Sequence, residues 1–175
     1  MSRITFSSRR GTRFLSGLVL AAAAVVALHA LDVRQIDTVQ PALAAPPDGQ
    51  QLYMTRCMSC HQVNGQGIMG VFPPLDGADW VTGDKGRLAR IVLHGMTGEM
   101  KVKDQVYSGA MPPWGPVLKD DEIAAILTYV RSSWSNDADA VTADEVAKIR
   151  TASSARKQPW TEKELADAAN QGIPE

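Results

Sequence analysis

Apolar residues recur at helical spacing in two segments of this 175-residue chain. The first segment lies between Asp84, which can cap the start of a helix, and Gly95, which can end one. The second runs from about Asp120, a further candidate N-cap, to Trp134. The apolar positions that repeat every three or four residues are Leu88, Ile91, Val92, Ile123, Ile126, Leu127 and Val130. This pattern predicts two amphipathic helices.

The remaining parts of residues 45–135 divide into one short helix and two irregular stretches. Asp48 can cap a helix that ends at the first cysteine, Cys57. Residues 64–77 are rich in glycine and proline, and residues 97–116 form the second irregular stretch. No segment alternates between apolar and polar residues for long enough to predict a strand. We therefore expect an all-α domain over residues 45–135.

Residues 136–175 form a C-terminal tail beyond this domain. The tail contains two capping boxes, Thr142-x-x-Glu145 and Thr161-x-x-Glu164. In a capping box a hydroxyl and a carboxylate accept hydrogen bonds from the free backbone N–H groups at the start of a helix. The tail is therefore expected to contain two short helices.

Residues 1–44 have the pattern of a targeting segment. Arginines precede an apolar run over residues 14–31, and Ala42-Leu43-Ala44 is a small-x-small sequence of the kind that signal peptidases cut. We expect a signal peptide that exports the domain to the periplasm. The alternative is an apolar run that is retained as an N-terminal anchor in the inner membrane, with the domain still in the periplasm.

Charge and composition narrow the class of partner. The whole chain has 18 basic and 19 acidic residues; without the five arginines and two aspartates of residues 1–44, 13 and 17 remain. No basic face is clustered as nucleic-acid binding requires, so we expect no nucleic-acid partner. Aromatic residues make up only 6% of the chain, so a core of side chains alone would be thin. A buried cofactor would remedy that.

The sequence Cys57-Met58-Ser59-Cys60-His61 is C-x-x-C-H, the signature for covalent attachment of haem. Residues three apart lie on one side of a helical turn, so both thiols can add to the vinyl groups of one porphyrin. The adjacent His61 can then bind the iron as its proximal ligand. Because these are the only two cysteines, the sequence predicts one covalently bound haem c per chain.

Two other readings of the cysteines are weaker. A disulfide or thioredoxin-like redox pair usually accompanies a βαβ pattern, which this sequence lacks. A zinc site would need a fourth ligand, and His94 is the only other histidine after residue 44. The haem interpretation therefore has the best support.

Methionine and histidine are the usual sixth ligands of such an iron. Met111 stands fifty residues after His61, in a stretch that Pro112 and Pro113 stiffen, and is our candidate for the second axial ligand. His94 is an alternative ligand, although a role at the end of its helix is the better interpretation. The other methionines after residue 44 are Met54, Met58, Met69, Met96 and Met100.

The chain resembles the class I monohaem cytochromes c of bacterial respiratory chains, in particular small periplasmic cytochromes and the cytochrome subunits that accompany dehydrogenases. The resemblance covers residues 48–134, half of the chain. The matching segments are Leu52 to His61, Phe72-Pro73-Pro74-Leu75, Leu93-His94-Gly95, Tyr107 to Pro113, and Ile123 to Trp134.

The resemblance implies a fold and a set of site residues. Helices wrap around one haem, with Cys57 and Cys60 as thioether donors and with His61 and Met111 on the iron. The first and last helices of the domain cross at Gly49.

It also implies electron transfer to and from periplasmic redox proteins, namely a dehydrogenase, an oxidase or a respiratory complex, and no catalysis of its own. One alternative is a cytochrome subunit that is permanently docked on such an enzyme, with residues 135–175 as the attachment device. Another is a five-coordinate haem sensor, which would require Met111 to be displaced from the iron.

Overall fold

The computed structural model describes residues 45–175. The signal peptide or anchor expected in residues 1–44 lies outside the described residues. Among residues 45–175, no helix is long and apolar enough to cross a membrane.

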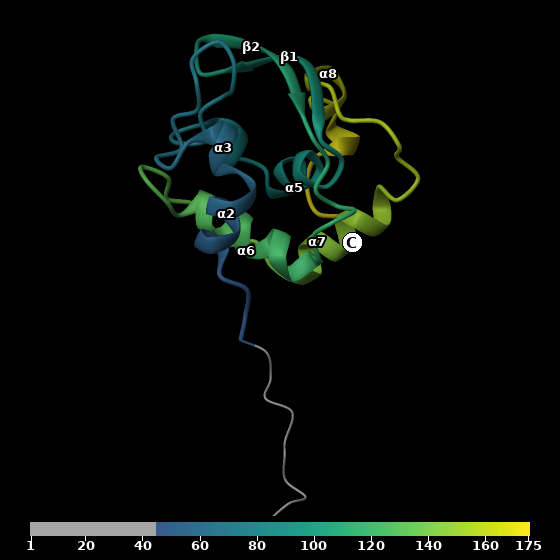
Figure 1. Cartoon of the computed structure of the whole chain (residues 1–175). Coiled ribbons are helices and arrows are strands. Elements are labelled where there is room, and N and C mark those ends of the chain that lie inside the picture. Colours follow the sequence, from purple (N-terminus) through teal and green to yellow (C-terminus); the bar gives the residue numbers. More distant parts are fainter. Residues whose placement is uncertain (1–44) are drawn as a thin grey trace, which may run out of the picture. The chain divides into compact units, whose positions relative to one another are not determined.

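Helices α2 (Gly49–Arg56) and α6 (Asp120–Arg131) cross each other (Figure 1). Asp48 caps α2 as predicted, because its carboxylate accepts a hydrogen bond from the backbone N–H of Gln51. The crossing lies at Gly49, as the resemblance implied: a Cβ atom on Gly49 would lie 2.1 Å from the carbonyl oxygen of Ala125. The absence of a side chain therefore allows the two backbones to approach.

Aromatic rings close the other end of this crossing. Tyr53 on α2 is fully buried, and its ring centroid lies 5.4 Å from those of both Tyr129 and Trp134. The Tyr53 hydroxyl donates a hydrogen bond to the carbonyl oxygen of Gln62. Tyr53 therefore connects α2 with α6 and with the residue that follows α3 (Met58–His61).

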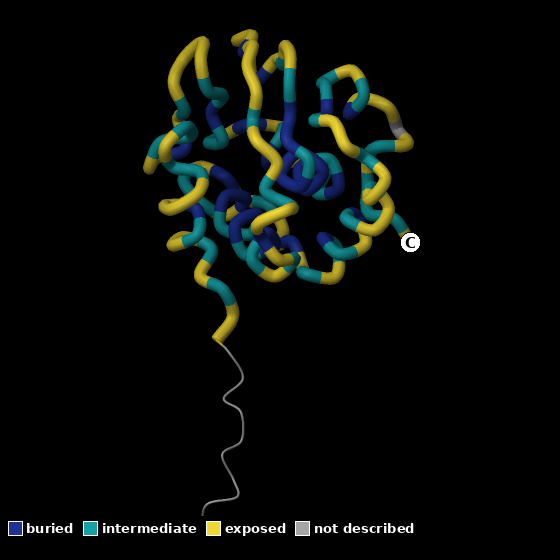
Figure 2. The backbone as a smooth tube through the Cα atoms, turned by 45° about the vertical axis from the view of Figure 1, so that its right-hand side comes forward, coloured by how far each residue is buried: buried dark blue, intermediate teal, exposed yellow. Residues whose placement is uncertain are grey.

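Helix α5 (Lys85–His94) forms the centre of the fold, and most of its residues are buried (Figure 2). Asp84 caps its start and Gly95 ends it, as the sequence predicts. The short helix α4 (Asp79–Thr82) precedes it. Most of α5 is buried because neighbouring elements pack around it.

The prediction of an all-α domain is wrong for residues 96–111. Strands β1 (Met96–Val102) and β2 (Gln105–Met111) form an antiparallel hairpin in which Met96 pairs with Met111. Glycines stand opposite each other within the strands, at Gly98 and Gly109, and glycine is depleted in strands generally. Lys103 takes the positive φ at the turn, where a glycine would have signalled a hairpin.

The tail contains α7 (Ala143–Ala152), α8 (Glu162–Leu165) and a 3₁₀ turn, η2 (Ala168–Asn170). Both capping boxes are formed, at Thr142 and at Thr161. Helix α7 packs on α5 and α6, and α8 packs beside β1 (Figure 1). Residues 45–175 therefore form a single compact unit that includes the tail.

Polar contacts also join the tail to the helices. Nε of Arg150 on α7 lies 2.7 Å from Oδ1 of Asp120. Asp120 was expected to be the N-cap of α6, but that position belongs to Lys119, whose backbone N–H donates to the carboxylate of Glu122. Glu122 thus satisfies the helix start, and the Asp120 carboxylate pairs with the tail instead.

The helix crossing yields a stability prediction. Gly49→Ala should lower the free energy of unfolding by roughly 1–3 kcal/mol, because the new Cβ meets a backbone carbonyl that cannot move away alone. Gly109→Ala is the control, since its nearest atom would be 3.9 Å away. Chemical denaturation of both variants checks this. An equal loss in the two would contradict it.

His94 lies in a positively charged part of the domain. Its Nε2 lies 2.7 Å from the hydroxyl oxygen of Ser153, and its ring meets the edge of the Trp160 ring. Burial lowers the pKa of His94, and the nearby cations lower it further; these are Arg156, Arg150, Lys157 and Arg90. The imidazole is therefore neutral at neutral pH, and it contacts the tail rather than acting as a cation at the end of α5.

The lowered pKa of His94 predicts a pH dependence of stability. In the unfolded chain His94 takes up a proton as the pH falls below about 6.5, whereas the folded protein resists this until lower pH. Stability should therefore fall as the pH is lowered through this window. His94→Gln should flatten the fall, as thermal unfolding from neutral to mildly acidic pH would show. Identical slopes in both proteins would refute the assignment to His94.

Candidate functional site

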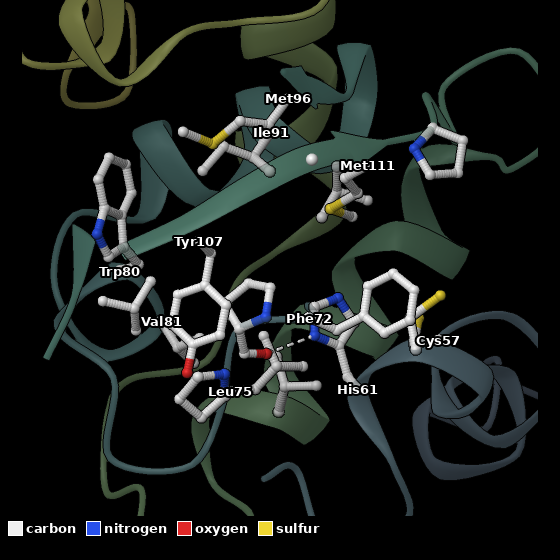
Figure 3. A pocket seen from close by; sticks show the side chains of 18 of the residues that line it. Cys57, His61, Phe72, Leu75, Trp80, Val81, Ile91, Met96, Tyr107 and Met111 are labelled. Atoms are coloured by element: carbon white, nitrogen blue, oxygen red, sulfur yellow. Dashed lines mark hydrogen bonds between the residues drawn. The ribbon is translucent and has the colours of Figure 1, made fainter. Parts of the chain in front are cut away.

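A cavity of about 350 Å³ lies between α3, the segment 71–75, α5, α6 and the hairpin. Its volume is within the range of about 300–1,000 Å³ that ligand and cofactor pockets have. In Figure 3, Met111 and Met96 lie on one side of this cavity, whereas His61, Cys57 and Leu75 lie on the opposite side. The cavity therefore brings the four predicted site residues, Cys57, Cys60, His61 and Met111, to one place.

The two cysteines lie on one helical turn at the edge of this cavity. Cys57 ends α2, and the backbone N–H of His61 donates to the Cys57 carbonyl oxygen at 3.0 Å. Both thiols line the cavity and are partly buried. This is the arrangement that attachment to one porphyrin requires.

The environment of Cys57 argues against a reactive dithiol. Burial raises the pKa of the Cys57 thiol to about 11, and the neighbouring Cys60 raises it as well. Redox-active cysteines have lowered pKa values, because the thiolate is the reactive form. The zinc interpretation also lacks support, since residues 45–175 contain no group of three or more His, Cys, Asp or Glu side chains that could hold a metal.

His61 is held in one orientation by the segment across from it. Its Nδ1 lies 3.0 Å from the carbonyl oxygen of Pro73, which can only accept a hydrogen. Nδ1 therefore carries the proton, and Nε2 is left free to bind a metal. Burial lowers the pKa of His61, although the hydrogen bond to Pro73 opposes this, so the neutral form is favoured. Neutral imidazole is the form that binds a metal.

A tight loop brings Pro73 to this position. The backbone N–H of Gly67 donates to the His61 carbonyl oxygen at 3.0 Å, and that of Leu75 donates to the Gly65 carbonyl oxygen at 2.7 Å. Gly67 has a φ of 63°, and a Cβ there would lie 2.2 Å from the Phe72 carbonyl oxygen. Only glycine fits such a close approach. The glycine-rich stretch thus serves to orient His61.

Met111 is the last residue of β2 and lines the cavity opposite His61 (Figure 3). Of the other methionines, Met96 and Met100 also line it, whereas 84% of Met69 is exposed. His94 is not among the lining residues. Met96 could not be identified as a wall residue from the sequence, because the pattern does not predict the hairpin that pairs it with Met111.

Aromatic side chains complete the wall. Trp80, Tyr107 and Trp114 line the cavity, whereas Tyr129 packs on Tyr53 away from it. The indole N–H of Trp80 donates to the backbone of β1 at Lys101. The rest of the wall consists mainly of aliphatic side chains from α4, α5 and α6, namely Val81, Leu88, Ile91, Val92, Ile126, Leu127 and Val130. These residue types fit a large apolar cofactor.

Comparison with known proteins also indicates a haem-binding protein. The family model "Cytochrome c" matches residues 47–134. The chain is 42% identical over 116 residues to cytochrome c-552 of Thermus thermophilus, covering 61% of this chain and 76% of that protein.

Two further relatives belong to enzymes. The cytochrome c subunit of the quinone alcohol dehydrogenase of Gluconobacter oxydans is 35% identical over 59% of this chain and 22% of that subunit. The cytochrome c subunit of the gluconate 2-dehydrogenase of Pantoea cypripedii is 34% identical over 66% of this chain and 27% of that subunit. With the match of the family model, the cavity and the cysteine pair beside it, this chain belongs to the cytochrome c family and binds haem c covalently.

Proposed function

We propose that this protein is a periplasmic electron carrier whose single haem is attached through Cys57 and Cys60 and bound by His61 and Met111. The observation that carries the proposal is the position of His61 and Met111 on opposite sides of one cavity (Figure 3). Haem supplies one-electron chemistry at its iron, and methionine with histidine as axial ligands raises its reduction potential.

The protein's own residues restrict what the iron can do. With His61 and Met111 both holding the iron, no position would remain for a substrate or for oxygen, so the protein would perform no bond chemistry itself. Pro73 fixes the orientation of His61 through its carbonyl oxygen. The aliphatic and aromatic walls exclude water. Few water molecules would then have to reorient when the iron gains or loses an electron, so the reorganisation energy would be small.

Electrons would enter and leave at the open edge of the cavity. The lining residues that are also exposed to solvent are Thr55, Arg56, Ser59, Val71, Gly98, Gly109, Ala110 and Pro112. They come from the end of α2, from α3, from the loop before Pro73, and from the hairpin with the residue that follows it. A partner that docks on this rim would approach the haem more closely than one bound elsewhere.

We favour a freely diffusing carrier over a permanently docked subunit. The docked alternative needs the tail as an attachment device, yet the tail packs on α5, α6 and β1 of its own domain. The chain also covers 76% of cytochrome c-552 but only 22–27% of the two dehydrogenase subunits. Its donor or acceptor would be a dehydrogenase, an oxidase or a respiratory complex, reached in the periplasm after export.

Replacement of Met111 tests the axial ligand. In Met111→Ala, the oxidised holoprotein should lose its sulfur-to-iron charge-transfer band and the reduced protein should bind carbon monoxide at least about tenfold faster, because the sixth position is open. The reduction potential should fall. Absorption spectroscopy and a redox titration measure all three.

Met96→Ala is the matched control, because Met96 lines the same side of the cavity. It should keep the charge-transfer band at temperatures well below unfolding, because the Met111 sulfur is still present. Loss of the band in Met96→Ala together with its retention in Met111→Ala would show that the ligand is Met96 on β1 and not Met111 on β2. A wild-type protein that lacks the band altogether would favour the five-coordinate sensor.

The size of the native particle tests the free carrier. Gel filtration of a periplasmic extract from the source organism should place the haem absorbance near the mass of a single chain, whose full sequence has 18.8 kDa. Purified recombinant protein added to a second sample serves as the size standard. Elution of the native haem in a much larger complex would instead support the docked subunit.

A further inference from the structure

The tail reaches the strand that pairs with Met111. The backbone N–H of Thr97 donates to the Trp160 carbonyl oxygen at 2.8 Å, and that of Trp160 donates to the Gly95 carbonyl oxygen at 2.9 Å. Trp160 thereby forms a parallel bridge with Met96, and Met96 pairs with Met111 in the hairpin. Trp160, Met96 and Met111 thus lie next to one another, in this order, on three adjacent backbone segments.

The Trp160 side chain belongs to an apolar cluster behind the methionine side of the cavity. It is 5% exposed and clusters with Ile91, Met96 and Leu165. Met111 packs against this cluster from the cavity side. Ile91 and Met96 also line the cavity, so the cluster backs the wall that carries Met111.

A cation holds the outer face of the indole. The guanidinium carbon of Arg156 lies 3.5 Å from the centroid of the Trp160 ring. Arg156 is fixed in turn by Glu164, whose carboxylate lies 2.8 Å away, and by the Pro159 carbonyl oxygen at 2.7 Å. A stacked guanidinium of this kind attracts the ring electrostatically and restricts its movement.

The indole occupies this place at an energetic cost. Its buried Nε1–H has no hydrogen-bond partner among residues 45–175, and burying an unpaired donor is unfavourable. The packing of the ring against the cluster must offset that cost. A second contact points to the same segment: a Cβ on Gly95 would lie 2.4 Å from the Met111 carbonyl oxygen, so the backbones at residues 95 and 111 touch.

We propose that Trp160, clamped by Arg156, is a positioning residue that keeps the Met111 sulfur on the haem iron. This inference rests on the proposed ligation by Met111. A methionine side chain has three rotatable bonds and adapts to loose surroundings, so its sulfur stays in place only where the wall behind it is rigid. The tail supplies that rigidity through Trp160, and so lowers the fraction of molecules in which the iron has an open position.

Carbon monoxide binding to the reduced holoprotein measures that fraction. The observed rate is proportional to the population with Met111 detached, so Trp160→Ala should raise it about tenfold or more. The charge-transfer band of oxidised Trp160→Ala should also disappear at a lower temperature than global unfolding. Trp160→Phe, which keeps an aromatic ring and removes the unpaired N–H, should restore both properties to nearly the wild-type values.

Ile149→Ala is the matched control. Ile149 is fully buried in the same tail, but it does not belong to the Trp160 cluster and does not line the cavity. Its truncation leaves a void and so also costs stability. Its carbon monoxide rate should stay within about twofold of wild type, because the wall behind Met111 is intact. Arg156→Gln should give an intermediate increase, and it serves as the second test should Trp160→Ala fail to fold.

The outcomes separate this inference from the proposed function. Equal acceleration in Trp160→Ala and Ile149→Ala would mean that Trp160 only stabilises the fold, and would overturn the positioning role. No acceleration in either Trp160→Ala or Arg156→Gln would overturn it as well. If instead the wild-type protein shows no sulfur-to-iron band, the ligation itself fails, and Trp160 has no ligand to position.

Discussion

The rest of this structure depends on a large apolar cavity that an ordinary protein interior would not contain. Protein cores are packed about as densely as organic crystals, and side chains that line a void lose their dispersion contacts. Here α5, α6, the hairpin and the segment 71–75 all direct side chains into one space of about 350 Å³. Haem c supplies the missing apolar surface, which explains how a chain with only 6% aromatic residues builds a core. Folding and cofactor binding are therefore linked, because the walls pack fully only around the haem.

The two sides of the cavity are built in different ways. On the His61 side the parts are close in sequence: Cys57, Cys60 and His61 share one helical turn, and Pro73 follows twelve residues later. On the Met111 side the parts come from far apart, because β2 pairs with β1 and β1 is bridged by Trp160 of the tail. Local contacts need little loop closure and survive when tertiary packing loosens, whereas distant ones do not.

This difference also decides what could be predicted from the sequence. The C-x-x-C-H motif, the caps at Asp48 and Asp84 and the crossing at Gly49 depend on short-range chemistry or on the resemblance to cytochromes c, and the structure contains them. The hairpin was missed because its alternation rests on glycines and methionines and its turn has Lys103 where a glycine is usual. The packing of Trp160 could not be predicted, since nothing local in the tail specifies which strand it meets.

The same asymmetry bears on how an electron carrier of this family can fail. His61 follows directly on the two cysteines, so a haem joined to both thiols would keep His61, the proposed proximal ligand, near the iron even in a loosened chain. Met111 has no such tether and depends on the hairpin, on Gly95 and on the tail behind Met96. Partial opening should therefore release the Met111 side before the His61 side. An iron with an open position binds small ligands, so under the proposed ligation the packing that holds Met111 would also be what limits the protein to electron transfer.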